Sequence, residues 1–350
     1  MNITIARLRS NVKYNGPLKT VLDSFFENYV KWMKDNPQHE YKTYNVSFDN
    51  TRPKRTPETI EWADVIIIPS DSEFRYHGKV PQINPKDLAR SEEHMDNIRP
   101  YFKNKHVIVW QSDRADTEDL YRNETLKNIE LKSFNSIDEL DFSANIHGMK
   151  YHFIQTLKSP LFGDVINKTS DFAYWGKMRG VDLTETDNIS LETKRLIGTE
   201  RGKLIRQIYR SDLSTVLVGG FPSGIVRQSK WIKDWHILYP MLEPCRSTLC
   251  FNWLDPTATS ARYAEALAMN IVPFVWKEYD KNNTYNIEDW QRVASFEDFY
   301  EKVLQLRDNT FFESRIESYK NNFKQILLSE DEYLKEFSDK MNVCIKENIK

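Results

Sequence analysis

The order of apolar and polar positions predicts strands that alternate with helices along the first half of the chain. Residues 3–6 form a short β-rich run, and apolar side chains then recur at helical spacing from residue 17 to about residue 34. Residues 64–68 and 106–110 are apolar on both faces, which is typical of central strands in a parallel sheet. A helix is expected between them, over residues 85–103. This alternation predicts a parallel sheet covered by helices on both faces.

The same pattern starts again after a break. Pro160 and Gly163 interrupt the alternation, so we expect a domain boundary near residues 160–170. Four further strands are predicted, at residues 172–175, 215–219, 248–252 and 271–276. A helix is predicted over residues 260–269, and the chain is predicted to be helical from residue 296 onward.

These elements predict an α/β protein with two Rossmann-like domains, residues 1–165 and 166–330. The final helix, from about residue 331 to residue 350, has an apolar stripe that includes Phe337 and Met341. That stripe needs a partner to pack against. Ligands of open parallel sheets bind at the carboxyl ends of the strands, so we expect the site in a central cleft that both domains face.

Composition supports two folded domains. The chain has 350 residues, more than the roughly 250 at which a single core stops growing. Hydrophobic residues make up 40% of it and charged residues 29%, which favours a folded protein over a disordered chain. Neither half has Gly-x-Gly-x-x-Gly after its first strand, which argues against a nicotinamide-dependent enzyme.

Charge, cysteines and hydropathy narrow the class of protein further. The formal net charge is -2, so any contact with nucleic acid has to come from a local basic patch. Three irregularly spaced cysteines match neither a disulfide framework nor a zinc site, so no metal-binding residue is predicted. No apolar run approaches the ~18–20 residues of a membrane span, and the amino terminus lacks a signal-peptide pattern. We therefore expect a cytoplasmic protein with no membrane partner.

Two arginines after the first strand of the second domain are candidates for binding a diphosphate. Arg179 follows Gly176 at the end of that strand, and Arg201 opens a later helix. A diphosphate leaving group gains negative charge as it departs, and two converging guanidinium groups would stabilise it. The alternative is that both arginines are solvated surface residues.

Glu265 is a candidate for binding a ribose. It lies in the first turns of the helix predicted over residues 260–269, next to a strand end. A carboxylate at this place can accept hydrogen bonds from both hydroxyls of a nucleotide ribose. The alternative is an ordinary glutamate on a helix surface.

Several short motifs resemble, in order and spacing, those of the phage DNA glycosyltransferases. The similar segments are residues 70–79 (Ser-Asp-Ser-Glu-Phe-Arg-Tyr-His-Gly-Lys), Gln111-Ser112-Asp113-Arg114, Tyr174 to Gly180 with Arg201, and Arg262-x-x-Glu265. No single motif is specific, but they are collinear over the whole chain. The resemblance implies an inverting glycosyltransferase with a GT-B fold. In that fold the final helix packs back on the first domain and completes it. Its donor would be a UDP-sugar and its acceptor the hydroxymethyl group of 5-hydroxymethylcytosine in double-stranded DNA.

The resemblance also implies roles for individual residues. Asp113 would be the catalytic base that takes the proton of the acceptor hydroxyl; the alternative is that it caps a helix beginning near Thr117. The residues implied for the UDP-sugar are Gly176, Arg179, Arg201, Gly219, Gly220, Arg227, Arg262 and Glu265. The donor is the one required small molecule, and Mg²⁺ assistance is compatible with the sequence.

DNA would bind loops of the first domain. The implied DNA and acceptor residues are Arg52, Lys54, Arg55, Ser72, Arg75, Tyr76, His77, Lys79 and Arg114. A base inside a duplex cannot reach a buried cleft, so the enzyme would have to extrude it while basic side chains hold the phosphates. Charged loops are more often solvated faces, and lone aromatic residues more often belong to a core.

The sequence departs from the family pattern at two places. About twenty residues, near 181–199, are inserted between Arg179 and Arg201, which makes Arg227 a substitute candidate. The family has a carboxylate that touches glucose, whereas Lys19 and Thr20 stand nearest to that position here. The transferred sugar is therefore glucose or a pentose such as arabinose.

Two other functions fit the same pattern. One is a GT-B transferase with a polysaccharide, lipid or small metabolite as acceptor. The other is a non-catalytic module that binds a nucleotide sugar or DNA, since fold alone does not establish catalysis. We expect a monomer in the cytoplasm of a phage-infected bacterium.

Overall fold

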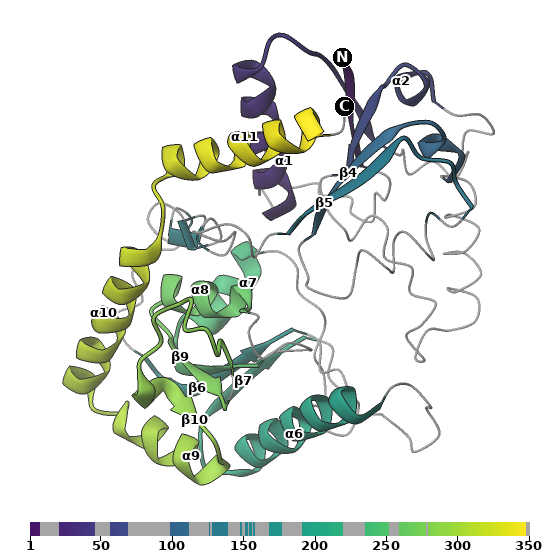
Figure 1. Cartoon of the computed structure of the whole chain (residues 1–350). Helices are drawn as coiled ribbons and strands as arrows, with labels where there is room; N and C mark the ends of the chain where they lie inside the picture. Colours follow the sequence, from purple (N-terminus) through teal and green to yellow (C-terminus); the bar gives the residue numbers. More distant parts are fainter. Residues whose placement is uncertain are drawn as a thin grey trace. The chain divides into compact units, whose positions relative to one another are not determined.

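Figure 1 shows a computed structural model of the chain, which forms two compact units. The first unit consists of Met1–Ser143 and Leu328–Lys350, and the second of Ala144–Leu327. The structure describes residues 1–7, 21–45, 57–68, 99–111, 126, 128–138, 148, 151–152, 154–155, 157, 168–176, 191–219, 235–251, 259–277 and 279–347. Within these ranges, no helix has the length and apolar character that crossing a membrane requires.

The first unit contains a five-stranded parallel sheet. Its strands are β1 (Asn2–Arg7), β2 (Glu40–Asn45), β3 (Val65–Ile68), β4 (His106–Gln111) and β5 (Ser133–Asp138), and their order in the sheet is β2-β1-β3-β4-β5. Its helices are α1 (Val21–Asp35), the short α2 (Glu58–Glu61), the 3₁₀ helix η3 (Arg99–Phe102) and α11 (Glu330–Glu347). All four residues of β3 are buried, as expected for a strand with neighbours on both sides.

Helix α11 returns to the first unit and packs against α1, as Figure 1 shows. The Phe337 ring lies 5.0 Å from that of Tyr29, edge to face, and 5.4 Å from that of Trp110 on β4. Trp32 Nε1 donates a hydrogen bond of 3.2 Å to Asn342 Oδ1. The prediction that the last helix packs on the first domain is confirmed.

The second unit contains another five-stranded parallel sheet. Its strands are β6 (Ser170–Trp175), β7 (Thr215–Val218), β8 (Cys245–Cys250), β9 (Val272–Trp276) and β10 (Arg292–Val293), in the order β10-β9-β8-β6-β7. Its helices are α6 (Leu191–Arg210), α7 (Trp235–Leu242), α8 (Ala261–Ala268), the 3₁₀ helix η6 (Asp289–Gln291), α9 (Phe296–Gln305) and α10 (Asn309–Ile326).

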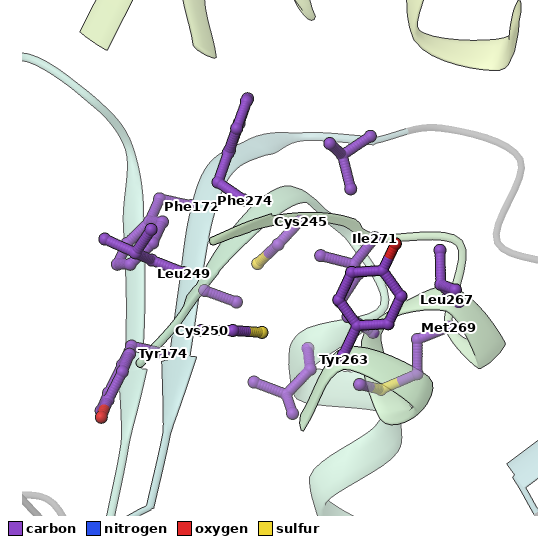
Figure 2. Close-up of a cluster of buried hydrophobic side chains, with 14 of the residues drawn as sticks. Phe172, Tyr174, Cys245, Leu249, Cys250, Tyr263, Leu267, Met269, Ile271 and Phe274 are labelled. Atoms are coloured by element: carbon purple, nitrogen blue, oxygen red, sulfur yellow. The ribbon is translucent and has the colours of Figure 1, made fainter. Parts of the chain in front are cut away.

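The core of the second unit gathers apolar side chains from the sheet and from its helices. Figure 2 shows Cys245 and Cys250 among Phe172, Leu249 and Ile271 in this cluster. Burial raises the pKa of both thiols to about 12, so both cysteines are protonated packing residues at neutral pH.

The two sheets have the same topology, and this topology defines where a ligand can bind. In the second unit, the chain leaves β6 for β7 on one side and later adds β8 on the other side of β6. Helices α6 and α8 follow β6 and β8 respectively. Such a reversal opens a crevice at the carboxyl ends of the two strands, here β6 and β8.

Several element boundaries differ from the sequence-based expectations. Strands β2 and β5 were not predicted, because their sequences, EYKTYN and SFNSID, are largely polar. Strand β8 begins at Cys245 rather than at residue 248, since the buried Ser247 and Thr248 extend it beyond its apolar part. Helix α6 begins at Leu191, inside the segment interpreted as an insertion.

The boundary between the units also lies earlier than expected. We expected it near residues 160–170, whereas the second unit begins at Ala144. The reason is that Tyr151 and Ile154 are buried in the core of the second unit. Of the helix expected over residues 85–103, the structure describes only residues 99–103, where η3 is a 3₁₀ helix; residues 85–98 lie outside the described ranges.

Candidate functional site

The crevice at the carboxyl ends of β6 and β8 brings together residues from three elements. Tyr174 and Trp175 end β6, Arg201 comes from α6, and Arg262 and Glu265 come from α8. All five belong to the second unit. We call these five residues the crevice cluster.

Two glycines allow the backbone to turn sharply beside this cluster. Gly176 has φ +120° and Gly219 has φ +140°, and residues other than glycine rarely adopt φ values in this region. A Cβ on Gly219 would lie 2.1 Å from the carbonyl oxygen of Gly176, and one on Gly176 would lie 2.8 Å from Arg262 Nη2. Both positions therefore require glycine, and the ends of β6 and β7 come into close backbone contact.

Tyr174 lies between two guanidinium groups. Arg201 Nη1 donates a hydrogen bond of 3.4 Å to the Tyr174 hydroxyl, and Arg262 Cζ lies 4.3 Å from the centre of the Tyr174 ring. Burial alone would raise the pKa of Tyr174, but the positive charges of Arg262 and Arg201 outweigh burial and hold that pKa below its usual value. Figure 2 shows the hydroxyl pointing away from the other labelled side chains of the core. The potential around this hydroxyl is therefore strongly positive.

Arg262 links α8 to the end of β6. Its Nη2 donates a hydrogen bond to the carbonyl oxygen of Trp175, and its guanidinium lies 5.4 Å from the centre of the Trp175 ring. Its Nε is buried and has no hydrogen-bond partner among the described residues. Buried polar groups nearly always have a partner, so this N–H is suited to donate to a bound anion.

Glu265 supplies a negative charge at the edge of the positive region. Its side chain is only 4% exposed, and Oε2 accepts a hydrogen bond of 2.6 Å from Trp175 Nε1. The interpretation of Glu265 as an ordinary glutamate on a helix surface is therefore wrong. Trp175 fixes the orientation of the carboxylate.

The crevice cluster can thus bind a ligand in which a negatively charged group lies next to a hydrogen-bond donor. Two guanidinium groups suit phosphate oxygens, and an oriented carboxylate suits hydroxyl groups. Arg201 is 7% exposed and lies 5.8 Å from the centre of the Phe251 ring, so it is not a solvated surface arginine. Charges held in so buried a place interact more strongly with a ligand than charges in water do.

The structure describes five of the predicted donor residues and brings them together at the carboxyl end of the second sheet. They are Gly176, Arg201, Gly219, Arg262 and Glu265. Outside the described ranges lie Asp113, Arg179, Gly220 and Arg227, together with Arg52, Lys54, Arg55, Ser72, Arg75, Tyr76, His77, Lys79 and Arg114. Tyr174, Trp175 and Phe251 were not predicted as site residues from the sequence. The signal that could have found the first two is the pair of aromatic residues directly before Gly176.

Acidic, histidine and cysteine side chains are the residues that could hold a metal ion. In the ranges that the structure describes, no group of three or more such residues could hold a metal ion. Glu265 is the one carboxylate in the crevice cluster, and its Oε2 is bonded to Trp175.

This chain is similar to known proteins in its structure. No protein-family model matches the sequence, and no curated protein matches it either. The T4 phage enzyme BGT in complex with UDP and Mn²⁺ superposes with a TM-score of 0.57 at 14% identity, covering 97% of this chain and 99% of that one. T4 phage BGT in complex with its UDP-glucose substrate gives a TM-score of 0.55 at 13% identity, with coverages of 97% and 99%.

A third solved structure, described as the DNA-modifying enzyme β-glucosyltransferase in the presence and absence of uridine diphosphoglucose, is similar to the same degree. Its TM-score is 0.56 at 12% identity, and the match covers 99% of this chain and 100% of the other. At so low an identity the likeness concerns the fold. This chain has the two-domain GT-B fold, with two parallel sheets of five strands, that the β-glucosyltransferase structures have.

Proposed function

We propose that this protein is an inverting glycosyltransferase that modifies DNA. The sugar, glucose or arabinose, passes from a UDP-sugar to the hydroxymethyl group of 5-hydroxymethylcytosine in a duplex. The observation that carries the proposal is the crevice cluster, which includes Arg201, Arg262 and Glu265. It lies at the carboxyl ends of the strands, where open parallel sheets bind ligands. The GT-B fold shared over the full length of both chains supports it.

In this proposal the diphosphate of the donor binds the two described arginines. Arg201, from α6, donates to the Tyr174 hydroxyl, and the guanidinium of Arg262, from α8, lies over the Tyr174 ring, so both charges lie close to this one side chain. Negative charge grows on the diphosphate as the bond to the sugar breaks, and fixed positive charges stabilise that change most. Arg179, Gly220 and Arg227 would complete this part of the site.

Glu265 would bind the ribose of UDP. Its Oε2 accepts a hydrogen bond from Trp175 Nε1, which holds the carboxylate in a single orientation. A carboxylate in a fixed orientation can accept hydrogen bonds from ribose hydroxyls, and such charge-assisted bonds are stronger than neutral ones. Trp175 acts here as a positioning residue.

Asp113 would be the general base of the transfer. It lies two residues after the end of β4, at the carboxyl edge of the first sheet by sequence. The carboxylate takes the proton of the hydroxymethyl group while the oxygen attacks the anomeric carbon from the face opposite UDP. The new C–O bond forms as the bond to the diphosphate breaks, so UDP leaves and the anomeric configuration inverts.

The DNA acceptor accounts for the basic loops of the first unit. Extrusion of the modified base brings its hydroxymethyl group out of the duplex, and Arg52, Lys54, Arg55, Arg75, Lys79 and Arg114 would hold the phosphates. Ser72, Tyr76 and His77 would contact the extruded nucleotide or take its place in the stack. These residues stay a prediction from the sequence.

A direct assay tests the proposal. The purified protein is incubated with duplex DNA containing 5-hydroxymethylcytosine in two parallel reactions, one with UDP-glucose and one with UDP-arabinose. The masses of the resulting nucleosides are then measured by mass spectrometry. A mass increase of one hexose or one pentose is expected. Transfer only to a polysaccharide, lipid or metabolite acceptor, or UDP binding without any transfer, would overturn the DNA-modifying function.

Replacing the proposed base separates catalysis from binding. Asp113→Asn keeps the size of the side chain but cannot accept the proton, so single-turnover transfer should fall by about 10²–10⁴-fold. The affinities for UDP and for DNA, measured by calorimetry, should change little. A near-native transfer rate in this variant would make Asp113 a helix cap and place the base elsewhere.

A further inference from the structure

Helix α6 carries a row of basic side chains on the face opposite Arg201. Lys203, Arg206 and Arg210 recur at intervals of three and four residues, so they share one side of the helix. We call these three residues the α6 basic stripe. At about 100° per residue they lie roughly 140–200° around the helix from Arg201. The stripe is therefore separate from the crevice cluster.

The two faces of α6 have different environments. Leu204, Ile205 and Ile208 are buried in the core of the second unit, which fixes the rotation of the helix. Lys203 and Arg210 are exposed, and Arg206 is half-buried. Tyr209, next to the stripe, is 45% exposed, which is unusual for a large aromatic side chain. Figure 1 shows α6 along the lower border of the second unit.

The charges of the stripe are not neutralised within the described part of the molecule. None of its three residues forms a hydrogen bond or an ion pair with another described residue. Residues 201–210 include four basic and no acidic residues, in a chain whose formal net charge is -2. Positive charge is therefore concentrated on this face although the protein as a whole is slightly acidic.

We propose that the α6 basic stripe binds the phosphate backbone of duplex DNA. This inference rests on the proposed DNA acceptor and adds a contact surface on the second unit to the loops predicted on the first. The stripe recognises phosphates without regard to base sequence, and thereby holds the duplex while one base is extruded.

The dimensions of the stripe match this ligand. Seven residues separate Lys203 from Arg210, which corresponds to about 10 Å along the helix axis. One strand of B-DNA has a phosphate about every 3.4 Å along its axis, so about three phosphates of a strand pass the stripe. Three cations thus face about three phosphates.

A basic residue near the end of a helix also has a local role. Arg210 lies in the last turn of α6, where a positive charge interacts favourably with the helix dipole and stabilises the helix. Lys203 and Arg206 lie further inside the helix, where this effect is weak. A purely structural role would therefore show in the stability of the Arg210 variant and leave DNA affinity unchanged.

The salt dependence of DNA binding tests the stripe. The affinity of the full chain for a duplex, with and without 5-hydroxymethylcytosine, is measured between 50 and 300 mM salt. The variant Lys203→Ala/Arg206→Ala/Arg210→Ala should reduce the slope of log K against log salt by about 2.7, or 0.9 for each lost phosphate contact. At 0.1 M salt, with 1 M salt as the reference, this corresponds to a loss of affinity of about 500-fold for both duplexes.

A matched control removes the same charge elsewhere. Lys324, Lys335 and Lys346 are exposed on α10 and α11, and their joint change to alanine should leave the slope unaltered. UDP affinity should be native in both variants, which verifies that the crevice cluster is intact. If the alanine variant of the stripe does not fold, the corresponding glutamine variant replaces it.

The possible results separate the stripe from the proposed function. If the wild-type protein modifies DNA and the stripe variant retains the native slope, the stripe proposal is wrong while the proposed function stands. If the wild-type protein neither binds nor modifies duplex DNA, both are wrong. Binding of poly-glutamate instead of DNA through the same three residues would assign the surface to an acidic protein and also overturn the proposal.

Discussion

At Tyr174, burial and charge act in opposite directions, and the outcome can be measured through pH. The two arginines lower the pKa of this phenol although its burial would raise it. A group whose pKa is lower in the folded state than in the unfolded state contributes stability that is fully present above the unfolded value, about 10 for tyrosine. That contribution is lost as the pH falls through the folded value.

We therefore predict that the free energy of unfolding of the wild type, minus that of Tyr174→Phe, increases as the pH rises toward about 10. Urea denaturation at a series of pH values from about 7 to about 11 measures this difference. Tyr279→Phe is the control of opposite sign, because burial raises the pKa of Tyr279 well above its usual value. For Tyr279 the corresponding difference should decrease above pH 10. A flat profile for Tyr174 would contradict the convergence of the two arginines.

Glu265 yields a prediction about the donor. Glu265→Gln removes the charge but leaves an amide oxygen that can still accept the hydrogen bond from Trp175 Nε1. Loss of charge-assisted hydrogen bonds to ribose should weaken UDP binding by about 1.5–3 kcal/mol. Calorimetry with UDP measures the change, and Glu297→Gln, at an exposed position of α9, should bind UDP like the wild type. Unchanged affinity in a folded Glu265→Gln protein would exclude Glu265 from the site.

Individual site residues were predictable where residue type, helical spacing and strand ends coincide. Glu265 was a candidate because it lies in the first turns of a helix between two strands, whereas the role of Arg262, one turn earlier, was implied by the family resemblance. The burial of Arg201 was not predictable, because a single arginine in a polar helix has no sequence signal for its environment. The role of Tyr174 between two guanidinium groups depends on contacts 27 and 88 residues away in sequence.

Among the elements, the junction of β6 and β7 leaves no room for a side chain at Gly219. Gly219→Ala would place a Cβ 2.1 Å from the carbonyl oxygen of Gly176, at a φ that alanine rarely adopts. We predict a destabilisation of about 2–4 kcal/mol, measured by urea denaturation. Gly148→Ala is the comparison, since its Cβ meets only the end of the flexible Leu327 side chain. Its cost should be below about 1 kcal/mol, and equal costs would contradict the close approach at the strand ends.

The strands differ in how well their sequences predict them. β3 and β4 were predicted within a residue of their observed bounds, because central strands of a parallel sheet are apolar on both faces. β2 and β5 form the edges of the first sheet, where one side lacks a neighbouring strand, and their polar sequences resemble loops. Periodicity therefore did not reveal the two edge strands of the first sheet, whereas the more apolar edge strand β7 of the second sheet was predicted.

For the whole molecule, the two-domain architecture was predictable from repetition of the strand and helix pattern. The boundary was not, because the segment around Tyr151 and Ile154 is buried in the second unit by contacts distant in sequence. The final helix was predictable in position from its apolar stripe, which begins with Tyr333 and continues to Ile345. Its packing on the first unit was implied by the family resemblance. Its docking makes the first unit discontinuous in sequence, with the whole second unit inserted.

This discontinuity predicts that the first unit depends on the last residues of the chain. Phe337 is fully buried between Tyr29 of α1 and Trp110 of β4. Phe337→Ala should therefore lower the free energy of unfolding of the first unit by about 3–5 kcal/mol. The unfolding transition is followed by tryptophan fluorescence, since Trp32 and Trp110 both contact α11.

Val343→Ala is the matched control on the same helix, because Val343 is 51% exposed and its change should stay within about 0.5 kcal/mol of the wild type. UDP affinity should be native in both variants under conditions where the protein is folded, since the crevice cluster belongs entirely to the second unit. A Phe337→Ala protein that unfolds like the wild type would show that α11 contributes little to the first unit. Loss of UDP affinity in the folded variant would instead show that the crevice cluster depends on the first unit.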